Sequence, residues 1–178
     1  GNFIFFSSNK TGSAQIWQMN SDGSNQKQLT HKDGGFPLFM PRESEWLYYL
    51  HGIHRTLWRV SVKSGEEQMI LDKSRNYFSF SPDGSQLAFS EKQNDARALK
   101  VLSLDDNQII KIFYPGDKKG FLPNIVWMPD GKSLAYVSTN SEFQKNTLWI
   151  QPLSDEQPRK IADLGIDESN SISVAPDG

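Results

Sequence analysis

The sequence has three histidines, whose ordinary pKa lets them transfer a proton near neutral pH and whose imidazoles can also bind a metal ion. His51 and His54 lie three residues apart, so both imidazoles could reach one ion from a shared loop. A zinc site needs at least a third protein ligand and hydrogen-bonded support for each histidine. No Asp or Glu adjoins this pair, and Arg55 adds a repelling positive charge. The pattern therefore favours two solvated histidines, and we expect neither a metal ion nor another cofactor.

Covalent and acid–base catalysis lack a matching set of residues. The chain has no cysteine, which removes thiolate nucleophiles, disulfides and sulfur-ligated zinc. It has no Gly-x-Ser-x-Gly segment of the kind that places a serine at a strand-to-helix elbow. The carboxylate pairs Glu66–Glu67 and Asp105–Asp106 fall at expected hairpin turns, where water solvates them. We therefore expect a protein that is not an enzyme.

The charge balance argues against two classes of partner. The sequence carries 19 Lys and Arg against 21 Asp and Glu, for a formal net charge of −2. A surface that binds nucleic acid usually has an excess of positive charge. No apolar run approaches the roughly 18 residues that a membrane span needs. We therefore expect a segment that binds no nucleic acid and does not insert into a membrane. Its 178 residues are enough for one domain with a hydrophobic core.

An internal repeat is the main feature of the sequence. The tripeptide Pro-Asp-Gly recurs at residues 82–84, 129–131 and 176–178, at a spacing of 47 residues, and a degenerate copy, Pro41-Arg42-Glu43, comes earlier. Proline presets φ at the first corner of a turn, Asp bonds to nearby backbone, and Gly accepts a positive φ. Apolar or aromatic runs flank these turns, so each turn is expected to join two strands of a hairpin.

Four short strand-like runs make up each repeat. The expected first strands are residues 36–40, 77–81, 124–128 and 171–175. The expected second strands are 3–7, 46–50, 87–90 and 134–138. The expected third strands are 16–19, 57–60, 99–102 and 148–151, and the expected fourth strands are 26–30, 67–71, 108–113 and 159–162. No segment holds a helical apolar period, and four short strands per repeat are typical of a β-propeller blade.

The repeats resemble the TolB-like, WD40-like (PD40) β-propeller repeat family. Segments 81–90 and 128–138 match its Pro-Asp-Gly hairpin, and Ile16-Trp17-Gln18-Met19 followed by Leu29-Thr30 matches its second half. The resemblance covers the whole chain and implies an all-β propeller of four-stranded blades. Two departures, Pro41-Arg42-Glu43 at one turn and Lys100 at a position that is otherwise Trp, indicate more divergent blades.

The blades are expected within one domain, residues 1–178. Their expected bounds are about 1–30 plus 170–178, about 36–71, about 77–114 and about 124–162. In one interpretation, strand 171–175 pairs with 3–7 and closes a four-bladed ring. In the other, the chain is part of a propeller of roughly six to eight blades. We favour the second because the sequence stops inside a turn, and its open edge strands could then pair copies into a homo-oligomer.

Three tryptophans occupy equivalent third-strand positions: Trp17, Trp58 and Trp149. Their recurrence favours packing between blades over a stacking platform for a sugar or a base.

Loops that join fourth to first strands, and second to third strands, share one face of a propeller. These loops are expected at 31–35, 72–76, 115–123 and 163–170, and at 8–14, 51–56, 91–97 and 139–146. Loops on a rigid sheet frame often carry recognition, and 117–121 is the longest charged insertion. The candidate partner-binding residues are His54, Arg55, Arg75, Lys118, Lys119 and Phe121.

The expected function is that of a non-catalytic protein- or peptide-binding module, the sensory or scaffolding part of a larger bacterial envelope or regulatory protein. The resemblance implies a periplasmic or otherwise extracytoplasmic location, with a cytoplasmic location left open. The alternative is the gating propeller of a serine peptidase of the tricorn or prolyl oligopeptidase type, whose catalytic domain lies outside this chain. A channel-metal lactonase would need acidic or histidine side chains on the first strands, and residues 36–40, 77–81 and 124–128 contain none.

Overall fold

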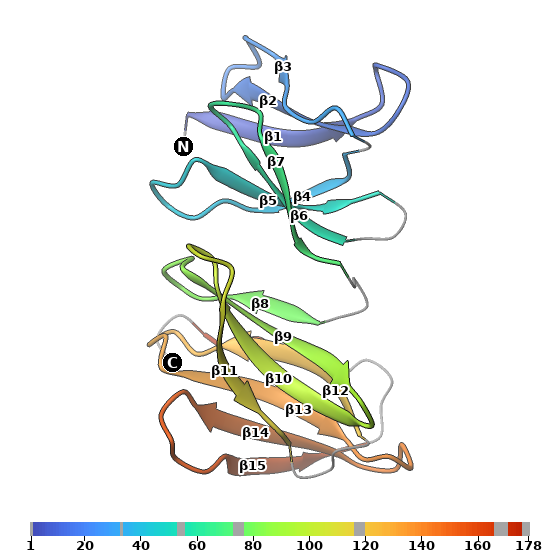
Figure 1. Ribbon diagram of the computed structural model, residues 1–178, viewed down its shortest axis with the longest axis vertical. Coiled ribbons are helices and arrows are strands. Elements are labelled where there is room, and N and C mark those ends of the chain that lie inside the picture. Colours follow the sequence, from blue (N-terminus) through green and yellow to red (C-terminus); the bar gives the residue numbers. More distant parts are fainter. Residues whose placement is uncertain are drawn as a thin grey trace. The chain divides into compact units, whose positions relative to one another are not determined.

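The computed structural model describes residues 2–32, 34–52, 56–72, 77–115, 120–165 and 171–175. All regular secondary structure in these ranges is β-strand (Figure 1). None of the ranges contains a helix that is long and apolar enough to cross a membrane. The chain divides into two compact units, Gly1–Arg75 and Asn76–Gly178, here called the N-terminal and C-terminal units.

The N-terminal unit contains two antiparallel sheets. The first has the order β1-β2-β3, with bounds β1 (Phe3–Ser8), β2 (Gln15–Asn20) and β3 (Lys27–Gln28). The second has the order β4-β5-β6-β7, with bounds β4 (Phe36–Phe39), β5 (Trp46–His51), β6 (Thr56–Ser61) and β7 (Glu67–Leu71). Within each sheet, every strand pairs with the next one along the chain, which is the meander of a propeller blade.

The C-terminal unit contains two four-stranded meanders. One consists of β8 (Phe78–Phe80), β9 (Gln86–Gln93), β10 (Ala96–Ser103) and β11 (Ile109–Phe113). The other consists of β12 (Phe121–Trp127), β13 (Ser133–Thr139), β14 (Asn146–Pro152) and β15 (Arg159–Leu164). The all-β fold and the four-strand repeat predicted from the sequence are therefore confirmed.

One expected strand differs. Residues 171–175 carry no strand in this structure, and the first sheet has three strands in the described residues. A strand forms only where its backbone groups find a partner, and both sheets of the C-terminal unit already hold their four strands. The pairing of 171–175 with 3–7, and the pairing of copies through open edges, stay predictions.

The Pro-Asp-Gly turn has the predicted chemistry at its clearest copy. The Asp83 carboxylate accepts hydrogen bonds from Ser81 Oγ at 2.6 Å and from the Ser85 backbone N–H at 3.0 Å. The Ser81 hydrogen bond, with those from Ser85, lowers the pKa of Asp83 below its usual range. Gly84 has a φ of 74°, the left-handed region that glycine enters without steric cost.

The degenerate turn closes one residue later than the Pro-Asp-Gly copies. Gly84 and Gly131 donate their backbone N–H groups to the carbonyls of Ser81 and Met128, which precede the prolines, whereas here Ser44 donates to the carbonyl of Pro41 itself. Gly131 of the later copy has a φ of 67°, and Glu43, at the equivalent position of Pro41-Arg42-Glu43, has a φ of 63°. A residue with a Cβ is strained in this region. The departure from the repeat pattern therefore changes the turn and adds a local cost at Glu43.

Each unit has an apolar core that spans its two sheets. In the N-terminal unit, Ile16 and Leu29 pack with Leu47, Tyr49 and Val60, and Trp58 lies against them. In the C-terminal unit, residues of β9 and β10 pack with residues of β12 and β13, and Trp149 lies against that cluster. Trp17 is buried as well. The prediction that these tryptophans pack between blades is confirmed for Trp58 and Trp149.

A buried polar network ties the first sheet to the segment that leads into the second sheet. Thr30 Oγ1 accepts a hydrogen bond from the Ile16 backbone N–H at 2.9 Å and donates one to Gln15 Oε1 at 2.8 Å. The same Gln15 oxygen accepts from the Gly34 backbone N–H at 3.2 Å. A Cβ on Gly34 would lie 2.8 Å from the Ile16 nitrogen and closer still to Thr30 Oγ1. The Leu-Thr ending of the repeat thus fixes where the chain leaves one blade for the next.

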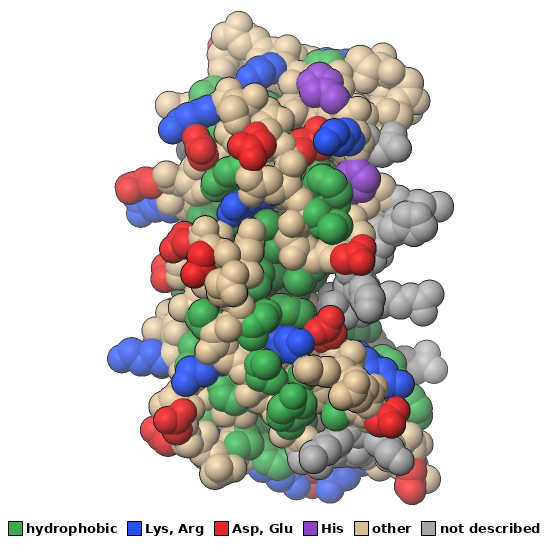
Figure 2. All heavy atoms as spheres, viewed as in Figure 1, with side chains coloured by type: hydrophobic (Ala, Val, Ile, Leu, Met, Phe, Trp, Pro, Cys, Tyr) green, Lys and Arg blue, Asp and Glu red, His purple; other side chains and the backbone are tan. Residues whose placement is uncertain are grey.

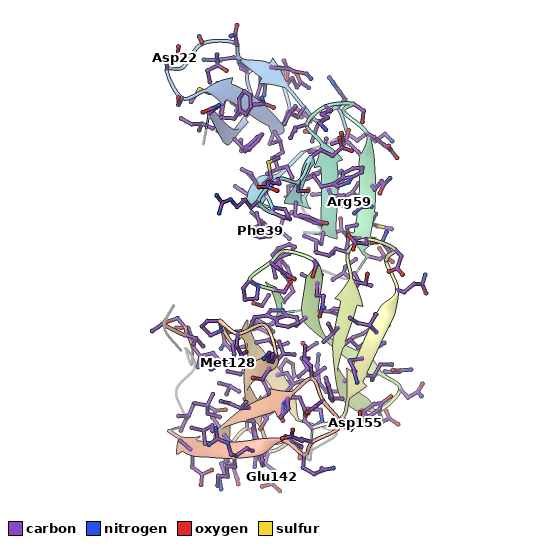
Figure 3. The ribbon with its side chains drawn as sticks, turned by 90° about the vertical axis from the view of Figure 1, so that its left-hand side faces the viewer. Asp22, Phe39, Arg59, Met128, Glu142 and Asp155 are labelled. Atoms are coloured by element: carbon purple, nitrogen blue, oxygen red, sulfur yellow. The ribbon has the colours of Figure 1, made fainter. Side chains whose placement is uncertain are left out.

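Charged side chains of both signs are interspersed on the face drawn in Figure 2. Arg59 on β6, labelled in Figure 3, shows how a buried cation is satisfied in this fold. Its guanidinium lies 4.2 Å from the Trp46 ring centroid and donates to Gln68 Oε1 at 2.8 Å. Arg59 therefore serves the structure of its blade.

Candidate binding site

Two aromatic side chains meet at exposed positions of the C-terminal unit. The ring centroids of Phe121 and Phe143 are 5.7 Å apart, and the rings are tilted by 45°. Phe121 is 41% exposed and Phe143 is 61% exposed. Phe121 begins β12, and Phe143 lies in the turn between β13 and β14. A fourth-to-first connection and a second-to-third connection therefore meet here, as expected for loops on one propeller face.

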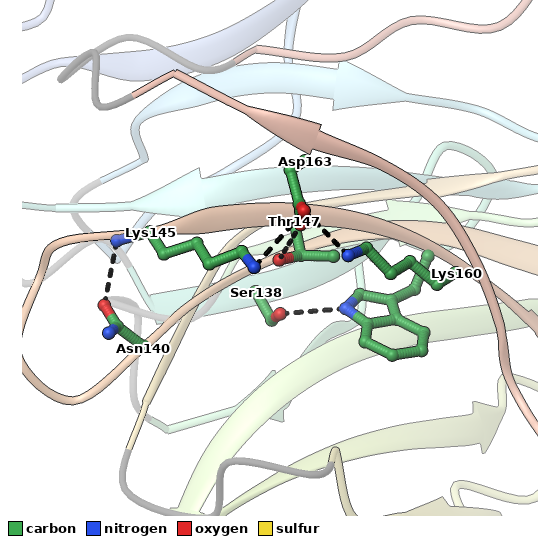
Figure 4. Close-up of polar contacts among 7 residues, drawn as sticks. Ser138, Asn140, Lys145, Thr147, Lys160 and Asp163 are labelled. Atoms are coloured by element: carbon green, nitrogen blue, oxygen red, sulfur yellow. Dashed lines mark hydrogen bonds and ion pairs between the residues drawn. The ribbon is translucent and has the colours of Figure 1, made fainter.

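The turn that carries Phe143 is held in a strained form. Phe143 has a φ of 57°, which is unusual for a bulky residue and costs about 1–3 kcal/mol. The side-chain oxygen of Asn140 accepts a hydrogen bond from the backbone N–H of Gln144 at 2.7 Å. It also accepts one from the backbone N–H of Lys145 at 3.0 Å (Figure 4). The turn therefore holds Phe143, whose ring is exposed, in a backbone conformation that is unfavourable for a bulky residue.

A second anchor lies at the end of the same turn. Lys145 Nζ is 3.2 Å from Asp163 Oδ2, which also accepts from Lys160 Nζ at 2.8 Å (Figure 4). Thr147 Oγ1 donates to the other Asp163 oxygen at 3.2 Å. The Lys160 hydrogen bond is the main cause that lowers the pKa of Asp163. The two lysines and Asp163 are exposed, so their ion pairs contribute little to stability. Their effect is to orient the end of the turn.

A buried polar pair closes the base of the turn. Thr139 Oγ1 donates to Asn146 Oδ1 at 2.6 Å, and Asn146 Nδ2 donates to the Gly165 carbonyl at 3.2 Å. Asn146 begins β14 as Gln15 begins β2, and both side chains tie the start of a third strand to the chain beyond the fourth strand. The Phe143 turn therefore rests on a rigid base.

Arg97 adds a positive charge to the aromatic pair. Its guanidinium carbon lies 4.5 Å from the Phe121 ring centroid, within the range of a cation–π contact. Arg97 on β10 pairs directly with Lys92 on β9, so the two cations share one face of the sheet. Neither forms a hydrogen bond from its side chain or an ion pair within the described ranges. The site thus offers two aromatic rings beside two uncompensated cations.

Of the residues predicted as partner-binding, Phe121 is described and the others are not. His54, Arg55, Arg75, Lys118 and Lys119 lie outside the described residues. Phe121 lies in a strand, and not in the loop expected at 115–123, because β12 continues through Pro123. The pairing of β12 with β13 is irregular between Phe121 and Asn124, and such an irregularity accommodates a proline.

The sequence analysis placed Arg97 and Phe143 within expected loops of the recognition face, at 91–97 and 139–146, but named neither as a candidate binding residue. The loop expected at 91–97 is mostly strand, since β9 and β10 extend to a tight turn at Asn94-Asp95. Only the isolated apolar letter in the polar run Ser141-Glu142-Phe143-Gln144-Lys145 could have drawn attention to Phe143. Glu142, labelled in Figure 3, is exposed in the same turn.

His51 is accounted for by packing. Its ring stacks on Trp58 with centroids 4.8 Å apart and contacts the backbone carbonyl of Lys32. Across the described ranges, no three His, Asp or Glu side chains are grouped as metal ligands. His54, the other member of the candidate pair, lies outside these ranges.

Comparisons with known proteins bear on the fold. No family model matches the sequence, and no curated protein matches it. TolB from Acinetobacter baumannii aligns over 90% of this chain and 42% of its own length, with a TM-score of 0.58 and 15% identity. A TolB-type protein from Agrobacterium tumefaciens aligns over 100% of this chain and 68% of its own, with a TM-score of 0.61 and 16% identity.

A peptidase gives a similar match. Porphyromonas gingivalis dipeptidyl peptidase 4 aligns over 93% of this chain, with a TM-score of 0.62 and 14% identity. The chain consists of β-propeller blades. It spans 31% of the peptidase and 42% of the Acinetobacter TolB, so it corresponds to part of each of these proteins.

Proposed function

We propose that this chain is a non-catalytic propeller module that binds a protein or peptide partner through the face that carries Phe121 and Phe143. The observation that carries the proposal is the exposed Phe143 ring, presented at a φ of 57° by a turn with two anchors. An exposed aromatic ring lowers solubility, and a positive φ is unfavourable for a bulky residue. Both costs are explained if a partner covers the ring.

The composition of the site fits recognition of a protein. Aromatic residues and arginine are enriched among the side chains that dominate binding energy in protein interfaces. Here they lie on strand ends and on an anchored turn, so little conformational entropy is lost when a partner binds. The module is proposed to belong to a larger bacterial envelope or regulatory protein, with an extracytoplasmic location. Support comes from the TolB-like repeat pattern and the fold shared with TolB.

Site-specific photo-crosslinking tests this function. A photoreactive phenylalanine analogue at position 143 would be exposed to light in the presence of the envelope fraction of the source bacterium. The same analogue at Ile161, which is 41% exposed on the outer strand β15, is the matched control. We expect a discrete crosslinked protein at position 143 that is absent at position 161. Equal, diffuse labelling at both positions would contradict the function.

The second candidate is the gating propeller of a serine peptidase. The fold shared with dipeptidyl peptidase 4 favours it. In that case the same reading frame encodes a hydrolase domain with a Gly-x-Ser-x-Gly elbow. Sequencing the complete gene separates the candidates, because a membrane-anchored regulatory or envelope protein would lack that domain.

A further inference from the structure

We propose that the site formed by Arg97, Phe121 and Phe143 takes an acidic peptide segment in which a carboxylate adjoins a large apolar side chain. The carboxylate would bind the Arg97 guanidinium, and the apolar side chain would lie on the two exposed rings. This inference rests on the proposed function, because it names the chemistry of the partner at the same site.

The cations of β9 and β10 differ in whether they have an ion-pair partner within the described residues. On one face of the strand pair, Lys100 Nζ is 2.6 Å from Glu91 Oε2, so that cation has an internal partner. On the other face, Lys92 and Arg97 are directly opposite each other, and Glu91 pairs with Ala98 and so points away from them. Like charges placed opposite each other destabilise a strand pair. A bound carboxylate removes that repulsion.

The guanidinium of Arg97 retains its capacity to donate hydrogen bonds. Arg59 makes the same kind of ring contact, with Trp46, but its guanidinium is buried and donates to Gln68. Arg97 donates from its side chain to no other described residue. Arginine can stack on a ring and still present two parallel N–H groups to a carboxylate. The geometry therefore suits an anion at the edge of the Phe121 ring.

The surrounding charges limit the class of ligand. Asp95 and Glu142 are exposed in the turns beside Arg97 and Phe143, and they would repel a densely charged polyanion. Single-stranded nucleic acid also offers anions and flat rings, but it needs a continuous basic track. Among the described residues on the face drawn in Figure 2, the charges are mixed in sign, and the net charge of −2 gives no excess of positive charge. A peptide with isolated carboxylates fits better.

A selection experiment tests this chemistry on the purified chain. A phage-displayed library of random peptides is panned on the wild-type chain, and the enriched sequences are measured on Arg97→Gln and Phe143→Gly. Arg42→Gln and Glu43→Gly are the matched controls, since they change the same residue type or relieve the same backbone conformation in a turn of the N-terminal unit. A synthetic enriched peptide is also compared with its Glu-to-Gln and Asp-to-Asn counterpart, and with fluorescent oligothymidine.

The inference predicts enriched peptides in which Asp or Glu adjoins an aromatic or aliphatic residue. Their affinity should fall about tenfold or more with Arg97→Gln, with Phe143→Gly and with the amide counterpart, and should not change with either control. Enriched peptides without acidic residues that still need Phe143 would overturn the inference and leave the proposed function standing. Tight oligothymidine binding that needs Arg97 would overturn the inference in favour of nucleic acid. Failure of any peptide to enrich would overturn both.

Discussion

The guanidinium carbon of Arg97 lies 4.5 Å from the centroid of the Phe121 ring. This contact links β10 of one blade to β12 of the next. Phe121 in turn contacts Phe143 from a third segment. Three segments that are separate in the sequence thus converge at one exposed point. Because each side chain lies on a strand end or an anchored turn, the arrangement is present before any partner arrives.

Phe143→Gly separates stability from binding. Glycine adopts a φ of 57° without strain, so relief of about 1–2 kcal/mol, less the entropy that glycine adds to the unfolded chain, should raise the free energy of unfolding by about 0.5–1 kcal/mol. Urea denaturation measures this change, and the selected peptide should bind more weakly. Glu43→Gly should bring a similar gain with unchanged binding. A loss of stability in Phe143→Gly would show that the ring supports the fold.

Gly34→Ala should disrupt the junction between the first two blades. Its Cβ would press on the Ile16 nitrogen and on the buried Thr30 hydroxyl, so we expect a loss of about 2–4 kcal/mol in the free energy of unfolding. Gly165→Ala is the control, since no atom lies within 4 Å of its added Cβ. If both variants melted at the wild-type temperature, the network of Thr30 and Gln15 would not hold the junction.

Trp149→Ala tests the packing between blades. The side chain is half-buried against the C-terminal core and its Nε1 donates to Ser138 Oγ at 3.0 Å. Truncation should cost about 3 kcal/mol, the lower end for a large aromatic residue because part of the ring is exposed. Trp149→Phe should cost about 1 kcal/mol, since it keeps most of the packing and loses the hydrogen bond. Equal losses in both variants would show that the hydrogen bond contributes more to stability than the packing of the ring.

Asp83→Asn should change the acid dependence of stability. The pKa of Asp83 is lowered in the folded state by the Ser81 hydroxyl and the Ser85 groups, so its charge stabilises the fold above the unfolded value of about 4. That contribution is lost as the pH falls through the lower folded pKa. The wild-type chain should therefore lose more stability than Asp83→Asn between about pH 5 and pH 2, as thermal melts would show. Parallel curves would contradict the assigned turn chemistry.

The repeat alone predicts most of the fold because its turns are local. Pro-Asp-Gly and Leu-Thr act through hydrogen bonds within a few residues or to the adjacent strand, so their spacing reports the blades directly. The extension of β12 through Pro123 escaped prediction because it depends on an irregular pairing with β13. Residues 171–175 form no strand in this structure because strand formation depends on a partner and not on propensity alone.

The site was predictable only in part. The sequence placed Phe121 on the loop face, but Arg97 meets it through contacts between β10 and β12 that no spacing encodes. The left-handed φ of Phe143 follows from the Asn140 hydrogen bonds, which give a non-glycine residue a conformation that sequence patterns reserve for glycine.

The Arg97 side-chain resonance in an NMR titration tests the central claim most directly. With the selected acidic peptide added to the nitrogen-15-labelled chain, the Nε–Hε signal of Arg97 should shift saturably along with the backbone amide of Phe143, and the amide of Glu43 should not shift. If the peptide bound while the Arg97 and Phe143 signals stayed in place, the partner would lie elsewhere on the chain and the proposed site would be wrong.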